Sequence, residues 1–340
     1  MLTTDYHRDE FFATEAGYME YMNANVTPWL KNTVKQGEYY GRDNIRLRYY
    51  YVCREDAQAD MVISHGFAEF FAKYHELAFY FYQAGYNVFF IEHRGFGHSE
   101  RFCDNPCMAY VDDFDDYVAD LHGFVRDVVG GRQGIKAIEW GRTEHNKPIF
   151  LFGHSMGGCI GALIAEKYPR DFDGVILSSP MLSLSWGGTP EPVMWAVLTA
   201  ETLTGGLYTY MPGQHDYEVG SRDFDNSSGQ SRKRYDYFMA VKDRDPDCRI
   251  SGASYAWGRA AIKAMERAIR TAKLIKAPTI MITAGQDNMV TPEGQKAFIK
   301  CNPKIKHINY AASKHEIYNS TDDIRMDYIR RVLDFYGSLL

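Results

Sequence analysis

A serine between two glycines, directly after a short apolar run, constrains the fold more than any other feature of the chain. Ile149-Phe150-Leu151-Phe152 is typical of a buried strand, and residues 159–165 are small and compatible with a helix. Between them lies Gly153-His154-Ser155-Met156-Gly157-Gly158. Glycines two residues before and after the serine leave room for a close crossing from strand to helix. The pattern predicts that the Ser155 hydroxyl is exposed above a sheet, where it is suited to act as a nucleophile.

The remainder of the chain alternates short apolar runs with segments of helical periodicity. Apolar runs without polar alternation are typical of strands that are buried on both faces. The expected strands are residues 61–63, 88–91, 149–152, 175–177, 279–283 and 307–310, and the expected helices are residues 72–83, 115–129, 156–168, 255–271, 292–299 and 322–336. This order predicts an α/β fold with a mostly parallel, doubly wound sheet of about eight strands, begun by an antiparallel hairpin over residues 38–52.

One interval breaks this alternation. Residues 182–253 contain no apolar strand run, and their first half is apolar whereas their second half is charged and rich in tyrosine. We interpret this interval as an inserted helical cap over the carboxyl edge of the sheet. The core then consists of residues 1–181 and 254–340, with residues 1–34 as an N-terminal extension that is helical or irregular.

Composition and motifs exclude several classes of protein. The net charge of −6 provides no field that would attract nucleic acid, and the glycine-rich motifs that bind nucleotides are missing. The six cysteines show neither C-x-x-C pairs nor the spacing of a zinc site. We therefore expect no metal, no cofactor and no nucleic-acid partner, while the oligomeric state is not indicated.

The sequence also bears on where the protein works. Its start has no apolar signal segment, and no window approaches the roughly 18 consecutive apolar residues of a membrane span. We expect a soluble, cytoplasmic protein with reduced thiols, able to lie at the inner face of the membrane. Cys103 and Cys107 are close enough in sequence to pair if they were oxidised, although cytosolic thiols are normally reduced.

A serine nucleophile needs a histidine that takes its proton and an acid that orients the histidine. Three histidines follow Ser155, and of these His215 falls in the cap and His307 falls inside the last strand. His315 follows that strand in a loop at the correct edge of the sheet, so we predict that it is the base. Asp287 follows the strand of residues 279–283 and is the predicted acid.

Attack on a carbonyl group creates an oxyanion, which needs hydrogen-bond donors that are already in place. In a fold with this serine turn, one donor is the backbone N–H after the nucleophile, here Met156, and the other comes from a loop after an early strand. That loop is Ser64-His65-Gly66-Phe67-Ala68-Glu69, in which the Phe67 N–H is the predicted second donor. Other polar residues near these motifs are expected to hold loops and turns by hydrogen bonds; they are His65, His93, His154, Glu69 and Glu92.

Five motifs of the chain resemble those of a known family. They are His65-Gly66-Phe67-Ala68-Glu69, Glu92-His93-Arg94-Gly95-Phe96-Gly97-His98-Ser99, Gly153-His154-Ser155-Met156-Gly157-Gly158, Gly285-Gln286-Asp287 and His315-Glu316. The chain resembles the α/β-hydrolase serine hydrolases grouped as monoacylglycerol lipases and bacterial lysophospholipases. The cap segments 231–235 and 249–257 are most similar to the lysophospholipase branch. The longer, acidic N-terminal segment and Glu92-His93, where an aspartate is common, depart from the family pattern.

The resemblance implies that Ser155, Asp287 and His315 hydrolyse one acyl ester of a lysophospholipid or a monoacylglycerol without a cofactor. The partner is then a small or lipid-like acyl ester, and the cap is the region that would touch a membrane surface transiently. Acyl length, head group and the opening of the cap are not defined by the sequence.

Three other functions use parts of the same pattern. An aminopeptidase that releases N-terminal proline has the same fold and triad, but it usually carries a second glycine where Phe67 stands; the cap acids Glu191, Glu201 and Glu218 would bind its substrate amine. A carboxylesterase for small esters and a binding protein without catalysis are the remaining alternatives. A dehalogenase is disfavoured because that chemistry places an aspartate at position 155.

Overall fold

Eight strands form a single sheet in the order β1-β2-β4-β3-β6-β7-β9-β10. The computed structural model describes residues 4–130, 147–185, 189 and 191–340. The strands are β1 (Lys35–Tyr40), β2 (Arg46–Val52), β3 (Ala59–Ser64), β4 (Tyr86–Ile91), β6 (Ile149–His154), β7 (Gly174–Ser178), β9 (Thr279–Ala284) and β10 (Lys306–Tyr310). β2 is antiparallel to β1 and β4, and all the other pairs are parallel. The predicted fold class is confirmed.

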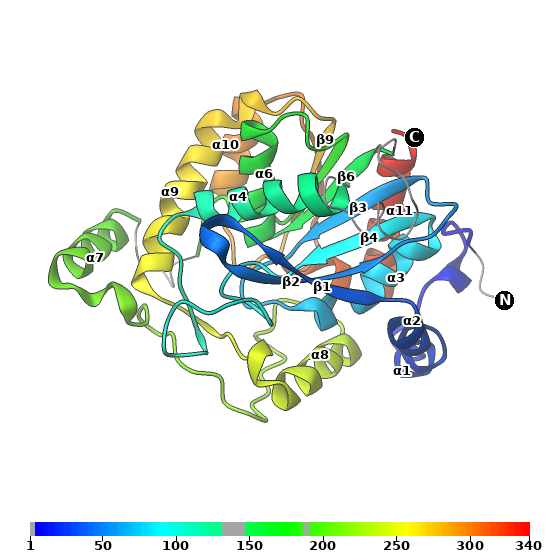
Figure 1. Cartoon of the computed structure of the whole chain (residues 1–340), viewed down its shortest axis with the longest axis horizontal. Coiled ribbons are helices and arrows are strands. Elements are labelled where there is room, and N and C mark those ends of the chain that lie inside the picture. The colour runs from blue at the N-terminus through cyan, green and yellow to red at the C-terminus, as the bar shows by residue number, and fades with distance from the viewer. Residues whose placement is uncertain (1–3, 131–146, 186–188, 190) are drawn as a thin grey trace.

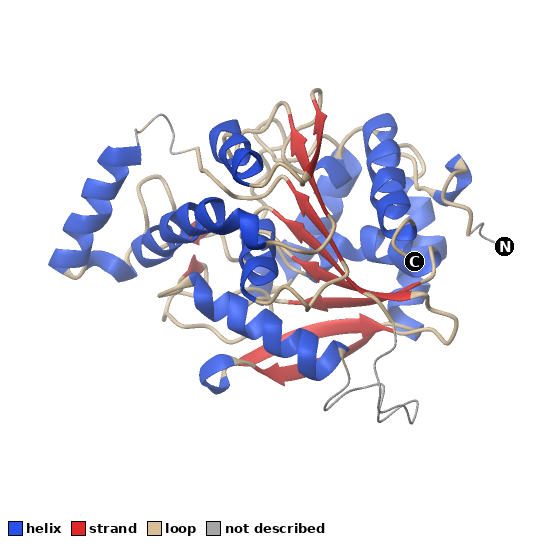
Figure 2. Cartoon of the chain, turned by 90° about the horizontal axis from the view of Figure 1, so that it is seen from above, coloured by secondary structure: helices blue, strands red, loops and turns tan. Residues whose placement is uncertain are grey.

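Helices cover both faces of this sheet (Figure 2). One face packs against α3 (His75–Gln83) and α11 (Asp322–Gly337). The other packs against α4 (Phe114–Phe124), α6 (Met156–Lys167), α9 (Tyr255–Thr271) and α10 (Pro292–Cys301). The two faces therefore bury two separate apolar cores, which is why the central strands are apolar without alternation. Every residue of β3, β4, β6 and β7 is buried.

Two helices of the expected cap lie outside these layers. α7 (Glu191–Thr204) projects at the left of Figure 1, and α8 (Arg232–Arg244) lies below the sheet in the same view. Leu198 of α7 is fully buried in the core cluster that also contains α9, whereas Val193 and Leu203 are 50% and 82% exposed. α7 therefore packs through one face and leaves apolar side chains on another.

A second sheet at the border of the cap was not predicted. β5 (Met108–Ala109) pairs in parallel with β8 (Gly252–Ala253). Two residues per strand are too few to produce a recognisable apolar run. This pair joins the loop after β4 to the end of the cap segment.

The N-terminal segment is helical and fastens α8 to the core. It contains a 3-10 turn (Asp9–Phe11), α1 (Tyr18–Tyr21), a π-turn (Met22–Val26) and α2 (Thr27–Asn32). Arg234 of α8 is almost fully buried and donates to Glu76 of α3 at 2.7 and 2.8 Å and to Glu15 at 3.2 Å. Arg325 of α11 is fully buried beside the same Glu76 and also donates to the Ala13 carbonyl.

Within the described ranges, no helix is long and apolar enough to cross a membrane. All six cysteines are free thiols, so Cys103 and Cys107 do not form a disulfide.

Candidate active site

Ser155 lies at the turn between β6 and α6 in a conformation that residues with a side chain rarely adopt. Its φ is +53° and its ψ is −117°. Neighbouring backbone holds this turn: the Ser155 N–H donates to the Ser178 carbonyl (3.0 Å), and the Ser155 carbonyl accepts the N–H of Met181 (2.9 Å). The side chain itself is partly exposed. This is the geometry of the nucleophile elbow that the glycine pattern predicted.

The flanking glycines are required by close backbone contacts. A Cβ atom at position 157 would lie 2.1 Å from the Ser64 carbonyl oxygen, and one at position 153 would lie 2.6 Å from the Gly157 carbonyl oxygen. Neither contact is possible between real atoms, so α6 can approach β3 and β6 this closely only with glycine at both positions.

Asp287 and His315 meet at the carboxyl edge of the sheet, after β9 and β10. His315 Nδ1 lies 2.7 Å from Asp287 Oδ2, and both side chains are buried. Asp287 Oδ1 also accepts the N–H groups of Met289 (2.9 Å) and Val290 (3.0 Å). Burial favours a higher pKa for Asp287, but the hydrogen bond and charge of His315 together with the two N–H groups lower it. An ionised Asp287 fixes the Nδ1 proton, which leaves Nε2 as the basic nitrogen.

Ser155 and His315 are held near one another, although their side chains are not hydrogen-bonded. Ser155 Oγ has no hydrogen bond to any residue that the structure describes. The loop after β7 links the two: Ser178 bonds to Ser155, and the next residue, Ser179, donates its hydroxyl to the His315 carbonyl (2.8 Å). The His315 ring also lies 4.9 Å from that of His154. Such catalytic contacts are often long before substrate binds.

The other two histidines after Ser155 lie elsewhere. His215 is exposed and its Nδ1 contacts the Asp216 carbonyl, while His307 on β10 bonds to the Thr283 hydroxyl at 2.8 Å. Neither contacts Asp287, which is consistent with the choice of His315.

The two predicted oxyanion donors lie after different strands, Phe67 after β3 and Met156 after β6. The N–H groups of Phe67 and Met156 have no acceptor among the described residues. The Gly66 N–H is already used, because it donates to Glu69 Oε2 at 2.5 Å. The Phe67 ring packs on Trp257 of α9 with centroids 4.5 Å apart, which fixes this side of the loop. Two amide donors at the site are thus available for a developing negative charge.

A buried network of charges lies behind this loop, and sequence reasoning missed most of it. Glu69 accepts hydrogen bonds from Tyr74 and Tyr318, and Lys73 Nζ lies 2.9 Å from Glu69 Oε1 and 2.7 Å from Glu316 Oε1. Burial opposes both charges, but Lys73 and the other donors hold the pKa of Glu69 well below its usual range, and Glu316 and Glu69 raise that of Lys73. The network connects the oxyanion loop with Glu316, the residue after His315.

The expectation for the loop-holding residues is confirmed for His65, His93 and Glu69 but is wrong for His154. His65 Nε2 accepts the His93 N–H at 2.9 Å, and His93 Nε2 contacts the Ser64 hydroxyl at 2.9 Å. In contrast, neither ring nitrogen of His154 has a hydrogen-bond partner within the described part of the chain. Burial lowers the pKa of His154 to about 3. This ring is therefore a neutral packing surface against His315.

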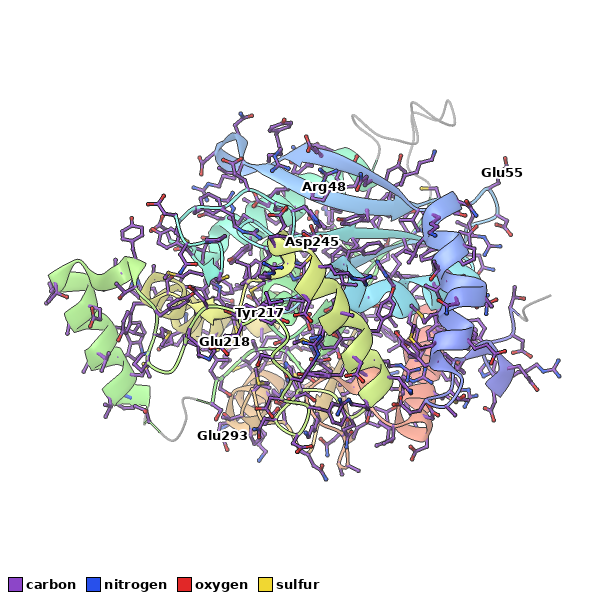
Figure 3. The ribbon with its side chains drawn as sticks, turned by 90° about the horizontal axis from the view of Figure 1, so that it is seen from below. Arg48, Glu55, Tyr217, Glu218, Asp245 and Glu293 are labelled. Carbon is purple, nitrogen blue, oxygen red and sulfur yellow. The ribbon has the colours of Figure 1, made fainter. Side chains whose placement is uncertain are left out.

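Two of the cap acids considered for a substrate amine, Glu201 and Glu218, show no contact with the triad within the described part of the chain. Glu201 lies against Gly206, and Glu218 is exposed on the side of the molecule where α8 lies (Figure 3). The side chain of Glu191 lies outside the described residues.

The chain is similar to a known family and to several known proteins. The profile of the Hydrolase_4 family, described as "Serine aminopeptidase, S33", matches residues 55–322. Lysophospholipase L2 of Escherichia coli is 25% identical over 315 residues, which cover 89% of this chain and 87% of the relative. Human monoglyceride lipase is 28% identical over 238 residues, which cover 70% of this chain and 68% of the relative.

The structural comparison shows the same fold. A soluble variant of monoglyceride lipase from Saccharomyces cerevisiae, in complex with a substrate analogue, has a TM-score of 0.68 at 18% identity and covers 90% of this chain and 94% of that one. Since the family profile extends from the loop before β3 to the start of α11, the chain belongs to the Hydrolase_4 family of serine hydrolases and has the α/β-hydrolase fold.

Proposed function

We propose that the protein hydrolyses a carboxylic ester of a lipid-like substrate, a lysophospholipid or a monoacylglycerol, through an acyl-enzyme on Ser155. The observation that carries this proposal is the 2.7 Å contact of His315 with Asp287 beside the strained turn of Ser155. The names of the relatives, lysophospholipase and monoglyceride lipase, support the substrate class.

The chemistry follows from the roles that the positions allow. Ser155 Oγ attacks the ester carbonyl carbon while His315 Nε2 takes the hydroxyl proton, and Asp287 stabilises the resulting imidazolium. The N–H groups of Phe67 and Met156 bind the oxyanion of the tetrahedral intermediate. His315 then protonates the leaving alcohol. A water molecule, deprotonated by His315, attacks the acyl-enzyme in the second half of the reaction and releases the carboxylic acid.

Apolar side chains of the elbow and of α7 belong to one large core cluster, which supports a long acyl chain as the substrate. Met156, which follows the nucleophile, belongs to the same apolar cluster as Leu182, Met194 and Leu198 of the cap segment, and Trp195 packs against it. An acyl chain bound between α7 and the elbow would meet apolar side chains on both sides. Each buried CH₂ group contributes about 0.8 kcal/mol, so such a surface favours long chains over short ones.

We further propose that the enzyme acts in the cytoplasm and meets its substrate through transient contact of α7 with the membrane surface. α7 carries the exposed apolar residues Val193 and Leu203, and Tyr208, 60% exposed, follows it. Its 14 residues include only two charges, Glu191 and Glu201. Exposed apolar side chains on a projecting helix suit the interface between head groups and acyl chains, and six free thiols suit a reducing compartment.

The experiment is a substrate series with a matched inactive variant. Wild-type protein is incubated with monoacylglycerols and lysophospholipids of rising chain length, with short p-nitrophenyl esters and with a proline p-nitroanilide, and products are quantified by mass spectrometry. We expect turnover of lipid esters, with loss of about 10⁴-fold or more in kcat for Ser155→Ala. A fluorophosphonate should label Ser155 in the wild type.

Each other outcome has a defined meaning. Hydrolysis of the proline amide without hydrolysis of any lipid ester would replace the proposal with the aminopeptidase function that the family description names. A preference for the short esters would make the protein a small-ester carboxylesterase. Absence of both turnover and labelling would leave a binding protein without catalysis.

A further inference from the structure

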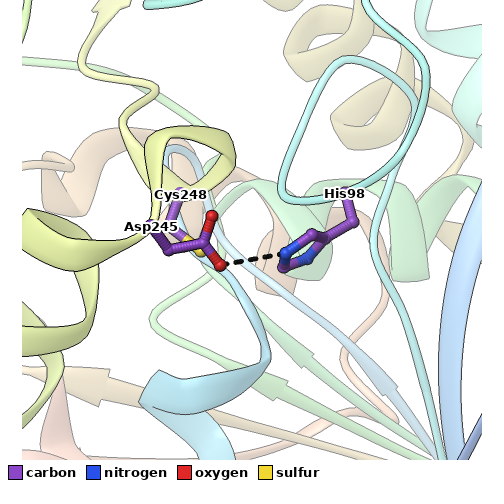
Figure 4. Close-up of side chains that lie close together, drawn as sticks. All are labelled: His98, Asp245 and Cys248. Atoms are coloured by element: carbon purple, nitrogen blue, oxygen red, sulfur yellow. Dashed lines mark hydrogen bonds and ion pairs between the residues drawn. The ribbon is translucent and has the colours of Figure 1, made fainter.

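Three side chains with metal-binding atoms converge where the cap meets the core, away from the triad. His98 lies in the loop after β4, Asp245 ends α8, and Cys248 closes the short turn Pro246–Cys248. His98 and Asp245 are each about one third exposed, whereas Cys248 is buried. One ligand atom of each lies within 4.8 Å of the others (Figure 4).

Both ring nitrogens of His98 face a carboxylate. Nδ1 lies 3.2 Å from Glu92 Oε2, and Nε2 lies 3.0 Å from Asp245 Oδ2. A neutral imidazole carries one N–H and one lone pair, so it can donate to only one of these carboxylates. The Tyr50 hydroxyl also lies 3.2 Å from Nδ1. When Nδ1 donates to Glu92, the lone pair of Nε2 faces Asp245 Oδ2, and a cation can be bound between these two atoms.

The buried thiol of Cys248, which packs beside Phe70 and Ala72, adds a third ligand atom. Histidine, cysteine and carboxylate are all ligands that zinc binds. In a tetrahedral zinc site, ligand atoms lie about 3.3–3.6 Å apart. The observed 3.0 Å between nitrogen and oxygen is close to this value, and the sulfur lies within 4.8 Å of both atoms, so a shift of about 1 Å at most brings it into place.

Glu92 completes the resemblance to a metal centre. It is fully buried, and it is fixed because it accepts the N–H groups of Phe71 (3.2 Å) and of His98 itself (2.7 Å). A histidine that ligates a metal through one nitrogen almost always donates the other N–H to a carboxylate, a carbonyl or water. Glu92 has that position at His98 Nδ1, which presents Nε2 to the cation.

We propose that His98 Nε2, Asp245 Oδ2 and Cys248 Sγ bind one divalent cation of the zinc class, with water in the fourth position. The cation ties the end of α8 to the loop after β4. None of the three residues contacts Ser155, Asp287 or His315, so the site is structural and does not depend on the ester-hydrolase proposal. The cysteine and histidine are 150 residues apart, which is why their spacing did not indicate a metal site.

The test measures binding directly. Full-length protein is freed of metal with a chelator and titrated with Zn²⁺ against a chromophoric competitor, and Co²⁺ is used to detect the thiolate-to-metal charge-transfer band. We expect one Zn²⁺ per chain and a cobalt spectrum with a thiolate ligand. Affinity should fall at least tenfold in Cys248→Ser and in His98→Gln, and about 10–100-fold in Glu92→Gln.

The matched control is Cys301→Ser, because Cys301 is exposed and lies on α10. It should bind zinc like the wild type, and circular dichroism should show that all variants are folded. The proposal is overturned if the wild type binds no stoichiometric zinc, or if Cys248→Ser and His98→Gln bind it as well as Cys301→Ser does. His98 would then carry a second proton, consistent with the hydrogen bond that it donates to Glu92 and with the charges of Glu92 and Asp245, which raise its pKa to about 9.

Discussion

Replacement of Glu69 by glutamine would remove the negative charge behind the oxyanion loop and leave the size of the side chain almost unchanged. The Glu69 carboxylate accepts four donors: the Gly66 N–H and the Tyr74 hydroxyl at Oε2, and Lys73 Nζ and the Tyr318 hydroxyl at Oε1. Glutamine has nearly the same volume, but its amide has one acceptor oxygen with two lone pairs and an NH₂ group that accepts nothing. At least two of the four donors must therefore lose their acceptor.

The size of the effect follows from this count. Hydrogen bonds to a charged group contribute about 1.5–3 kcal/mol each, so two lost bonds lower the free energy of unfolding by about 3–6 kcal/mol. Domains are stable by about 5–15 kcal/mol in total, so the variant should fold with a reduced margin. A loosened Gly66 turn also displaces the Phe67 N–H. Removal of an oxyanion donor costs about 10²–10³ in kcat, and we expect a loss of kcat of about 10–100-fold, below that ceiling.

The assay combines urea unfolding, followed by tryptophan fluorescence, with kcat and KM on the best ester substrate. Glu55→Gln is the control, because Glu55 is exposed in the loop between β2 and β3 and the variant changes the net charge equally (Figure 3). The expected signature is a lower unfolding free energy and a lower kcat with a smaller change in KM. An unfolding free energy within about 0.5 kcal/mol of the control would refute the reasoning on stability. A destabilised variant with unchanged kcat would refute the link to the oxyanion loop.

Three further changes test other parts of the structure. Gly157→Ala places a Cβ atom 2.1 Å from the Ser64 carbonyl oxygen. We expect the free energy of unfolding to fall by about 1–3 kcal/mol or more and the activity to be lost. A melting temperature equal to that of the wild type would contradict this. Burial raises the pKa of Glu166 to about 8, so the folded state keeps a proton that the unfolded state loses above its pKa of 4.5. In the wild type, the free energy of unfolding should fall by at most about 4–5 kcal/mol as the pH rises from about 4.5 to about 8, and in Glu166→Gln this fall should be absent. Parallel pH profiles of unfolding for the two proteins would refute the assignment. Deletion of residues 1–16 removes the contact of Glu15 with the buried Arg234. The deletion should lower the melting temperature and speed proteolysis of α8. If the melting temperature and the rate of proteolysis do not change, the N-terminal segment does not fasten α8 to the core.

The parts of the fold that the sequence predicted are those with a local signature. Strands buried on both faces are short apolar runs, so β3, β4, β6, β7 and β9 were recognisable from residue type alone. The elbow was recognisable because only glycine fits at positions 153 and 157, two residues before and two residues after Ser155. Asp287 and His315 followed from chain order, because an α/β sheet brings its strand ends to one edge.

The parts that were missed depend on partners far apart in the chain. Glu69 and Lys73, four residues apart, are typical of a solvated helix pair, and the third member, Glu316, lies 243 residues beyond Lys73. One signal was present: Lys73 stands among Phe70, Phe71 and Tyr74, and a lysine in an aromatic stretch is buried only when it is paired. For His154 the sequence held no such signal, because its position between Gly153 and Ser155 does not indicate whether its ring has a hydrogen-bond partner.

The two halves of the cap segment are held by different forces, and this difference indicates which half can move. α8 is fastened by buried charges: Arg234 pairs with Glu76, and Lys73 lies 4.8 Å from the ring centre of Phe238. Breaking one buried ion pair costs about 3–5 kcal/mol. α7 is held chiefly by Met194 and Leu198, and exposing such a side chain costs about 1.5–3 kcal/mol. A membrane surface would compensate that cost, because it offers α7 an apolar environment in place of α9, whereas it offers nothing to Arg234. Access of a lipid to Ser155 is therefore expected on the α7 side, whereas α8 stays fixed to the core.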